Sequence, residues 1–456
     1  MFMHRRSRRA LAAAALVALT LPPLATAGTP ARAASPTGTI TFFNYTVDPV
    51  SDALLRKDVK AFETSHPGAH VNLILVPPDQ YAAKSLLAVA SNQPPDIAWY
   101  DPIHYAWWKK GLIADLTPYI QADPVISNPK LFSTQYNAPF KFDGKHYFAL
   151  STGADGMMTY FNKTLFDKAK VPYPSQDFGP KGWTWQDFLK DCQRLTLDRN
   201  GKHPTDSGFD AQHVVQWGTT LSDSMSAWWG WQIVPWSYGA QLVDRPHDPT
   251  RFLMTDPKMV AALQFIQDLI YKYHVAPKPS QAQALFTNVD SFSTGKVAID
   301  LDGGWSLVPR ANITRFKWDI APLPGGPAGR FSPIWSAGFV MTTKARNPKL
   351  AWEFIRWAAA DPTWQRDQAV FRVPALRSVA DTFYKHPTGK GLPEHFLVRV
   401  QTLRKTYPGD IWHKHWNEIQ DKIWAGPLEQ YWRGEITAAQ LASQINDAST
   451  AYLSRP

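Results

Sequence analysis

Residues 40–76, ITFFNYTVDPVSDALLRKDVKAFETSHPGAHVNLILV, decide the fold. A short apolar run is followed by residues whose apolar members fall on one helical face, and a β-branched and aliphatic run closes the stretch. A second helical pattern covers 79–90, and residues 97–100 are typical of a third strand. This strand–helix order predicts an α/β fold with a mostly parallel sheet, helices on both faces and right-handed crossovers.

The rest of the chain continues this alternation of strand and helix patterns, with longer helices. Start signals and apolar periodicity predict helices over 184–195, 255–273 and 347–358. Ligands of open α/β sheets bind beyond the carboxyl ends of the strands, so the loops that follow the strands are the first places to look for a site.

Composition bounds the class of protein. The chain has 456 residues, of which 44% are apolar and 19% charged, which excludes a disordered or coiled-coil protein and fits two or three domains or one large bilobed one. Its one cysteine, Cys192, excludes a disulfide framework and any zinc site built from cysteines. The 20 Trp and 16 Tyr residues suit flat ligands with apolar faces and hydroxyl rims, sugars first among them.

The first 33 residues are typical of an export signal. Four arginines between positions 5 and 9 precede an apolar stretch over 10–21, which is too short to span a bilayer as a helix. Small-x-small patterns at 25–27 and 31–33 offer cleavage sites. A retained membrane anchor is the alternative, and the arginines loosely resemble a twin-arginine signal. With no cysteine nearby, we expect an exported, periplasmic or extracellular soluble protein that is not a lipoprotein. Since these residues carry half of the net charge of +10, no nucleic-acid partner is expected.

Seven segments, in order along nearly the whole mature chain, carry a family resemblance. They are VKAFETSHPG (59–68), ASNQPPDI (90–97), GLIADLTPYI (111–120), YFNKTLF (160–166), WTWQDF (183–188), FSTGKVAIDLDGGW (292–305) and AWEFI (351–355). The chain resembles the extracellular solute-binding proteins of ABC importers, in the large sugar-binding family that includes maltose-binding protein.

The resemblance implies a two-lobed α/β fold of the periplasmic-binding-protein type (class II), joined by a hinge with three crossovers. After the export signal at 1–33, the lobes would comprise 34–152 with 323–375 and 153–322 with 376–456. The implied function is capture of a mono- or oligosaccharide between the lobes and its delivery to an ABC permease in the membrane. A monomer without cofactor, metal or catalytic residues is expected.

Candidate ligand-binding residues follow two predicted strands. Asn44 and Tyr45 come directly after the first strand, and Tyr100 and Asp101 follow the third. By resemblance, Tyr100 and Asp101 supply a ring and a carboxylate to the sugar; the alternative is a turn before Pro102.

Further candidates are mostly tryptophans. Trp305 follows two glycines that permit close backbone approach, and the family places a stacking ring at the same position; a core role is the alternative. Asp155 aligns with a sugar-contacting acid at the hinge, where a turn is equally open. The remaining candidates lie in a tryptophan-rich cluster, beside the crossings or in the C-terminal helical region, where core packing or a surface salt bridge stays open: Trp228, Trp231, Trp335, Arg372 and Trp416.

The sequence offers little support for a catalytic or metal-binding site. The sequence has no GxSxG, P-loop, GxGxxG or HExxH motif. The spacing of His413 and His415 and the incomplete calcium-loop pattern after Asp198 favour structural roles. The rival hypotheses are a secreted carbohydrate hydrolase, for which Asp300 and Asp302 offer paired carboxylates, and an adhesive surface protein without a deep cleft.

Overall fold

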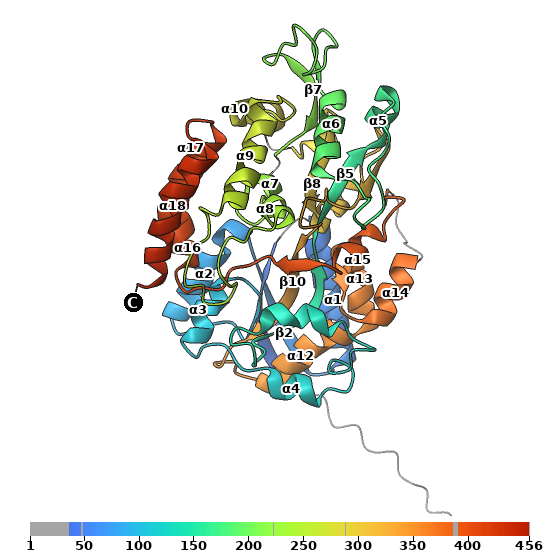
Figure 1. Ribbon diagram of the computed structural model, residues 1–456. Helices are drawn as coiled ribbons and strands as arrows, with labels where there is room; N and C mark the ends of the chain where they lie inside the picture. The colour runs from blue at the N-terminus through green and yellow to red at the C-terminus, as the bar shows by residue number, and fades with distance from the viewer. Residues whose placement is uncertain (1–35, 47–48, 222, 288, 386–390, 456) are drawn as a thin grey trace, which may run out of the picture. The chain divides into compact units, whose positions relative to one another are not determined.

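The computed structural model describes residues 36–46, 49–221, 223–287, 289–385 and 391–455 (Figure 1). Its strands are β1 (Gly38–Tyr45), β2 (Ala69–Val76), β3 (Ile97–Trp99), β4 (Ala149–Asp155), β5 (Met157–Asn162), β6 (Leu197–Asp198), β7 (Val214–Thr219), β8 (Val297–Gly303), β9 (Trp318–Ala321), β10 (Ser332–Met341), β11 (Val373–Pro374) and β12 (Thr406–Pro408). The helices of the first half are α1 (Pro49–Ser65), α2 (Pro78–Ala90), α3 (Ile103–Lys109), α4 (Thr117–Ala122), α5 (Lys163–Ala169), α6 (Trp185–Leu195), α7 (Asp223–Ser226) and α8 (Ile233–Tyr238). Those of the second half are α9 (Pro257–Tyr271), α10 (Pro279–Phe286), α11 (Leu307–Arg310), α12 (Pro348–Ala360), α13 (Pro362–Asp367), α14 (Arg377–Lys385), α15 (Val398–Thr402), α16 (Trp416–Ile419), α17 (Ala425–Trp432) and α18 (Ala438–Leu453).

The first sheet confirms the predicted α/β class and corrects the predicted strand directions. Its main path is β11-β4-β10-β3-β1-β2, with β12 paired to β10. The three N-terminal strands pair in parallel through β1, as predicted. However, β10 runs antiparallel to both β3 and β4, and β11 is antiparallel to β4. The sheet is therefore mixed rather than mostly parallel, because β10, which returns from the second sheet, and β11, which follows later in the chain, run opposite to their neighbours.

The second sheet has the order β6-β7-β8-β5-β9 and is also mixed, since only β7 and β8 pair in parallel. The chain passes from the first sheet to the second at Gly156, between β4 and β5, and returns between β9 and β10. After β12 it forms α16 to α18, whose buried side chains belong to the apolar core against the second sheet. The two sheets and their helices correspond to two lobes, whereas the residue boundaries of the lobes stay a prediction.

Local sequence signals explain where the long helices start. Thr184 and Asp187 form a reciprocal capping box at the start of α6. The Asp256 side chain accepts a hydrogen bond from the Lys258 amide at the start of α9, and Asn347 caps α12 in the same way. A proline in the first turn of α9 and of α12 fixes φ at a helical value. Its missing N–H costs no hydrogen bond, because amides of the first turn have no partner within the helix.

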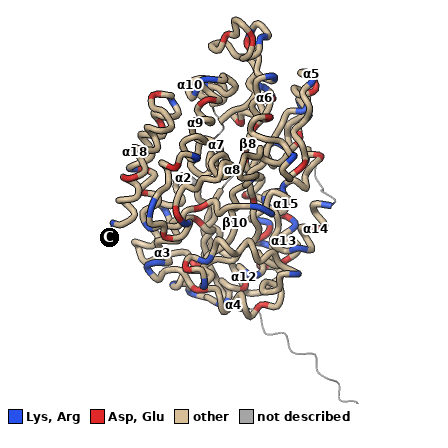
Figure 2. The backbone as a smooth tube through the Cα atoms, in the orientation of Figure 1, with Lys and Arg blue, Asp and Glu red and all other residues tan. Residues whose placement is uncertain are grey.

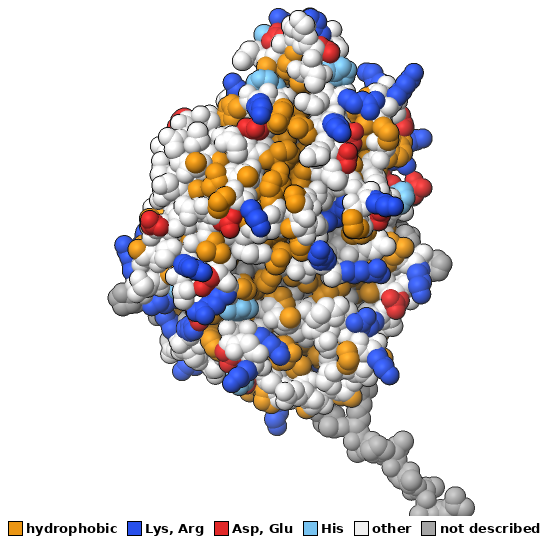
Figure 3. Space-filling view, in the orientation of Figure 1, with side chains coloured by type: hydrophobic (Ala, Val, Ile, Leu, Met, Phe, Trp, Pro, Cys, Tyr) orange, Lys and Arg blue, Asp and Glu red, His pale blue; other side chains and the backbone are white. Residues whose placement is uncertain are grey.

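Helices cover both faces of the first sheet, as predicted. One face packs against α1 and α12 through side chains such as Phe62 and Phe354, and the other against α3 through Tyr105. In the second half α18 lies beside α9 (Figure 1), and both contribute buried residues to one core. Figure 2 shows basic and acidic residues interspersed along the chain, and Figure 3 shows hydrophobic side chains gathered between α9 and α6 on the face in view.

The predicted export signal lies outside the described residues. Within the described residues, no helix combines the length and the apolar character needed to cross a membrane.

Candidate functional site

The carboxyl ends of β1 and β3 bring polar and aromatic side chains together. Asn44 and Tyr45 end β1, and Tyr100 and Asp101 directly follow β3. The Tyr45 hydroxyl donates a hydrogen bond to the Asp101 carboxylate, and its ring lies 4.4 Å from the ring of Tyr81. The pKa of Tyr45 is raised well above its usual value, first by burial and then by the charge of Asp101. Asn44 is 8% exposed, so it is largely buried and has little contact with solvent.

Tyr100 occupies a buried position next to this edge. Its hydroxyl accepts a hydrogen bond of 2.6 Å from the Trp412 indole and lies 3.4 Å from the Asp410 carboxylate. Burial, together with the nearby charge of Asp101, raises the pKa of Asp410 to about 7. The Tyr100 hydroxyl group is therefore engaged by other residues of the protein, so Tyr100 would offer a ligand the surface of its ring rather than a free hydroxyl group.

Asp410 should make stability depend on pH. Its folded-state pKa of about 7 lies above the value of about 3.9 of an unfolded aspartate, so the folded state binds more protons between these two pH values. The stabilisation of the folded state by protonated Asp410 should therefore be fully present at about pH 4. We expect it to be lost as pH rises towards 7, by at most about 1.4 kcal/mol per pH unit for one proton. Asp410→Asn should flatten that slope in urea unfolding measured from pH 4.5 to 7.5.

The matched control for this prediction is Asp421→Asn, which changes an exposed carboxylate. That variant should keep the wild-type slope. An Asp410→Asn protein with an unchanged slope would assign the pH dependence to other buried acids.

Two arginines lie beside the passage between the sheets. The Arg372 guanidinium sits 4.4 Å from the centre of the Trp99 ring, a cation–π contact at the end of β3. Arg399 on α15 is fully buried and binds the Asp155 carboxylate with its Nη2 at 2.5 Å. Burial raises the pKa of Asp155, and the Arg399 charge opposes that shift. Asp155 thus ends β4 as half of a buried ion pair.

Three tryptophans from both sheets meet at one place. Trp305 lies 5.2 Å from Trp335 and 5.6 Å from Trp229, measured between ring centres, and Trp229 lies 5.0 Å from Trp335. Trp335 belongs to β10 of the first sheet, whereas Trp229 and Trp305 belong to the half built on the second. Trp305 is 38% exposed, an unusual exposure for so large an apolar side chain in a cluster. We call these three residues the tryptophan triad.

The two positions before Trp305 must be glycine, because neighbouring groups leave no room for a Cβ atom. A Cβ atom on Gly303 would lie 2.2 Å from the Trp305 ring, and one on Gly304 would lie 2.2 Å from the Asp155 carboxylate. The sequence Asp302-Gly-Gly-Trp305 therefore lets the turn after β8 fold against both groups, which is the close backbone approach predicted for these glycines.

A groove of about 870 Å³ opens beside Trp305. Its volume is within the range of small-molecule sites. Polar and aromatic groups line it: Thr220, Ser226, Gln283, Phe286, Thr287, Asp290, Ser291, Asp302, Trp305, Ser306 and Trp432. Apolar residues of α9, α10 and the adjoining loops complete the wall. We call this cavity the Trp305 groove; it combines aromatic planes with carboxylates and hydroxyls.

A family model described as "Bacterial extracellular solute-binding protein" matches residues 48–363. The chain belongs to this family. A curated relative, a protein of Brucella abortus (strain 2308) named as a binding protein, is 23% identical over 303 residues, which span 65% of this chain and 66% of that protein.

Solved structures of solute-binding proteins share the fold. The ABC substrate-binding protein Lmo0181 from Listeria monocytogenes, in complex with cycloalternan, has a TM-score of 0.76 and 22% identity, over 92% of this chain and 100% of that one. The cyclic alpha-maltosyl-1,6-maltose binding protein from Arthrobacter globiformis has a TM-score of 0.70 and 18% identity, over 92% and 99%. The resemblance seen in the sequence is thereby confirmed for family and fold.

In this solute-binding protein the tryptophan-rich segment before α8 divides between core and site. Trp231 is fully buried and stacks on Trp424 at 6.3 Å, so it is a core residue rather than a wall of the groove. Trp416 is 2% exposed and packs edge-on against Trp228 at 4.7 Å, which places it in the core as well. Trp228 is half-buried against that core and is absent from the lining of the Trp305 groove. The ring that reaches the triad is Trp229, which was not among the predicted site residues.

Other residues of the candidate site also went unpredicted. Tyr81 and Trp99 contact Tyr45 and Arg372, and Asp290 lines the groove. Tyr81 lies in the first turn of α2, directly after β2, and the segment that follows a strand was a usable signal. The sequence gives no comparable signal for Asp290, because its position depends on a distant ion pair with Arg310.

The described residues contain one group of acids and histidine close enough to hold a metal ion, formed by Asp319, Glu394 and His395. His395 Nδ1 lies 2.6 Å from the buried Asp319 carboxylate, and Glu394 pairs with Lys163 at 2.9 Å. Each ligand atom thus already has a protein partner, as in a surface ion-pair network.

The incomplete calcium-loop pattern after Asp198 forms a turn. The Asp198 carboxylate accepts hydrogen bonds from the amides of Asn200 and Lys202, which is the geometry of a turn.

Proposed function

We propose that this solute-binding protein is the substrate-binding component of an ABC importer and captures a carbohydrate at the tryptophan triad and the Trp305 groove. The observation that carries the proposal is the exposed Trp305 ring at the groove, flanked by Trp229 and Trp335. Two relatives in fold, one solved with cycloalternan and one named for a cyclic maltosaccharide, support the choice of ligand class.

The chemistry of the groove suits a sugar ring. The C–H faces of a pyranose are weakly apolar and pack against aromatic planes, whereas each hydroxyl group needs a hydrogen-bonding partner. Asp290, whose side chain is 31% exposed, offers such a partner at the groove, where Asp302 and Ser306 are already hydrogen-bonded to each other. Since an unpaired buried polar group costs about 1–3 kcal/mol, this arrangement is able to distinguish hydroxyl patterns.

The rival hydrolase mechanism lacks its two free carboxylates. Asp300 is fully buried and Asp302 is 6% exposed, and both pair with Arg310, at 2.5 and 3.1 Å. A general acid and a nucleophile must both reach the scissile bond, which a fully buried Asp300 does not. A groove of this size also argues against an adhesive surface protein. We therefore propose a non-catalytic binder.

Ligand binding would favour closure of the two halves. The triad combines Trp335 of the first sheet with Trp229 and Trp305 of the second half, so a sugar at the triad touches both. A ligand that contacts both halves stabilises the closed conformation relative to the open one. The proposed partner of that closed form is the membrane permease of the importer, and the protein would act as an exported monomer.

A thermal-shift screen of the mature chain tests the proposal. We expect at least one carbohydrate among glucose, maltose, maltotriose, cellotriose, mannotriose and the glucosamine trimer to raise the melting temperature. At a hundredfold excess over Kd, the stabilisation is about 2.7 kcal/mol. Amino acids, short peptides and glycerol phosphodiesters serve as the comparison set. Stabilisation by one of these and by no sugar would contradict the carbohydrate assignment, and recovery of cleaved sugar would contradict a non-catalytic role.

A further inference from the structure

The described lining of the Trp305 groove holds acidic side chains and no basic one. Asp290 and Asp302 line it, and its described lining contains no lysine, arginine or histidine. The side chain of Asp290 is 31% exposed and that of Asp302 is 8% exposed. Both therefore border the groove, the first as its more accessible carboxylate.

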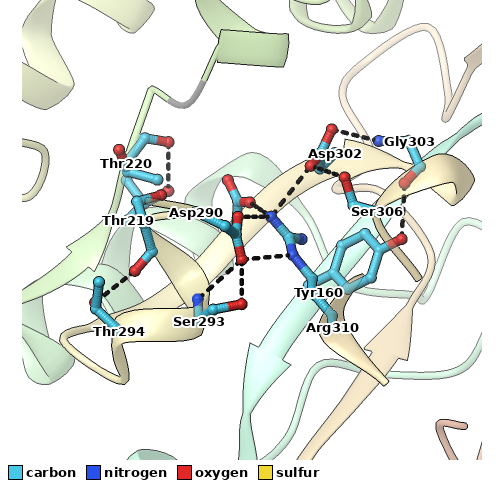
Figure 4. A network of polar contacts seen from close by, with 12 residues as sticks. Tyr160, Thr219, Thr220, Asp290, Ser293, Thr294, Asp302, Gly303, Ser306 and Arg310 are labelled. Atoms are coloured by element: carbon cyan, nitrogen blue, oxygen red, sulfur yellow. Dashed lines mark hydrogen bonds and ion pairs between the residues drawn. The ribbon is translucent and has the colours of Figure 1, made fainter. Parts of the chain in front are cut away.

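The cation that holds these acids lies beneath the groove. Arg310 is 1% exposed and pairs with Asp290 at 2.7 Å, with Asp300 at 2.5 Å and with Asp302 at 3.1 Å. Figure 4 shows Asp290 and Asp302 directed at its guanidinium group from different elements. The guanidinium carbon also lies 4.3 Å from the centre of the Tyr160 ring. The positive charge is thus enclosed by protein, while two of its three carboxylates reach the groove.

The balance of charge at the groove surface is negative. Burial would raise the pKa of Asp290, but the ion pair with Arg310 outweighs it and lowers the pKa, so Asp290 is ionised at neutral pH. One guanidinium group shared among three acids does not neutralise two carboxylates at the surface. A third acid, Asp300, is fully buried next to the same guanidinium group.

We propose that the Trp305 groove selects neutral or amine-bearing sugars and rejects acidic ones such as uronic acids. This inference rests on the proposed carbohydrate function and names the substrate class more narrowly. The groove accepts hydroxyl or ammonium donors at Asp290, its more accessible carboxylate, and Asp302 adds a second negative charge beside it. A carboxylate on the sugar would meet two like charges in a partly enclosed site, and such repulsion is an effective means of specificity.

Matched pairs of sugars test the inference. The neutral carbohydrate with the largest thermal shift in the screen is compared with its C6-carboxylate, made by oxidising its primary hydroxyl groups, by isothermal titration at low and high salt. We expect the acid to bind about tenfold more weakly or worse at low salt, with the difference reduced in 0.5 M NaCl. The glucosamine trimer should bind at least as tightly as cellotriose.

The variant Asp290→Asn removes one groove charge while keeping the shape of the side chain. It should improve binding of the C6-carboxylate severalfold relative to the neutral sugar, whereas Asp447→Asn, an exposed change on α18, should alter neither. An acidic sugar that binds as tightly as its neutral parent, or that gives the largest shift in the screen, would overturn the inference and leave the carbohydrate function standing. Failure of every sugar to bind would overturn both.

Discussion

Replacing Arg399 with methionine is expected to lower the free energy of unfolding by about 3–5 kcal/mol, because it leaves the buried Asp155 carboxylate without its counter-charge. Arg399 is fully buried and Asp155 is 6% exposed. The guanidinium group contacts both carboxylate oxygens, with Nε at 3.3 Å and Nη2 at 2.5 Å, and donates a third hydrogen bond of 2.6 Å to the Val370 carbonyl. Methionine keeps much of the side-chain volume, so the loss reports the charge and the hydrogen bonds.

Urea unfolding at pH 7 measures this effect, with Arg404→Met as the matched control, since Arg404 is exposed on the same segment. The double variant Asp155→Asn/Arg399→Met should be less destabilised than the single variant Arg399→Met, because it no longer buries an unpaired charge. Equal losses for Arg399→Met and Arg404→Met would show that the pair contributes little to stability.

Much of the fold follows from local sequence. The parallel pairing of β1 with β2 and β3 follows from the alternation of strand and helix patterns, and the capped starts of α6, α9 and α12 follow from single residues such as Thr184 and Asn347. The directions of β10 and β11 were not predictable in this way. Their pairing joins residues far apart in the chain, such as Trp335 with Asp155, and period-2 patterning does not encode strand direction.

The site was less accessible to prediction than the fold. Strand ends single out Tyr45 and Asp101 as candidates, and a motif singles out Trp305, because in each case the signal is local; their role in ligand binding stays a prediction. Within the segment that contains Trp228, Trp229 and Trp231, composition alone does not decide which ring faces the core. That choice depends on the distant partners Trp424 and Trp416 for the buried rings and on Trp335 for the ring of the triad.

Truncating Trp305 to alanine should weaken binding of the best neutral sugar by about 30-fold or more, which corresponds to the loss of roughly 2 kcal/mol typical of a central aromatic contact. The ring contributes one wall of the groove and contacts both other members of the triad, so its removal opens the site to water. Folding should change less than binding, because a 38% exposed side chain gives up less buried surface than a core tryptophan.

Isothermal titration with the sugar chosen in the screen measures the loss, and Trp305→Phe should recover part of it because it restores an aromatic plane. Trp352→Ala is the matched control: Trp352 lies on α12, packs against Tyr119 with 5.1 Å between ring centres and is absent from the groove. If Trp305→Ala and Trp352→Ala both bind within about twofold of the wild type, the sugar lies elsewhere. Because Trp305 adjoins Trp335 of the first sheet, Trp305→Ala should also reduce the closure that the sugar induces, which small-angle scattering with and without sugar would reveal.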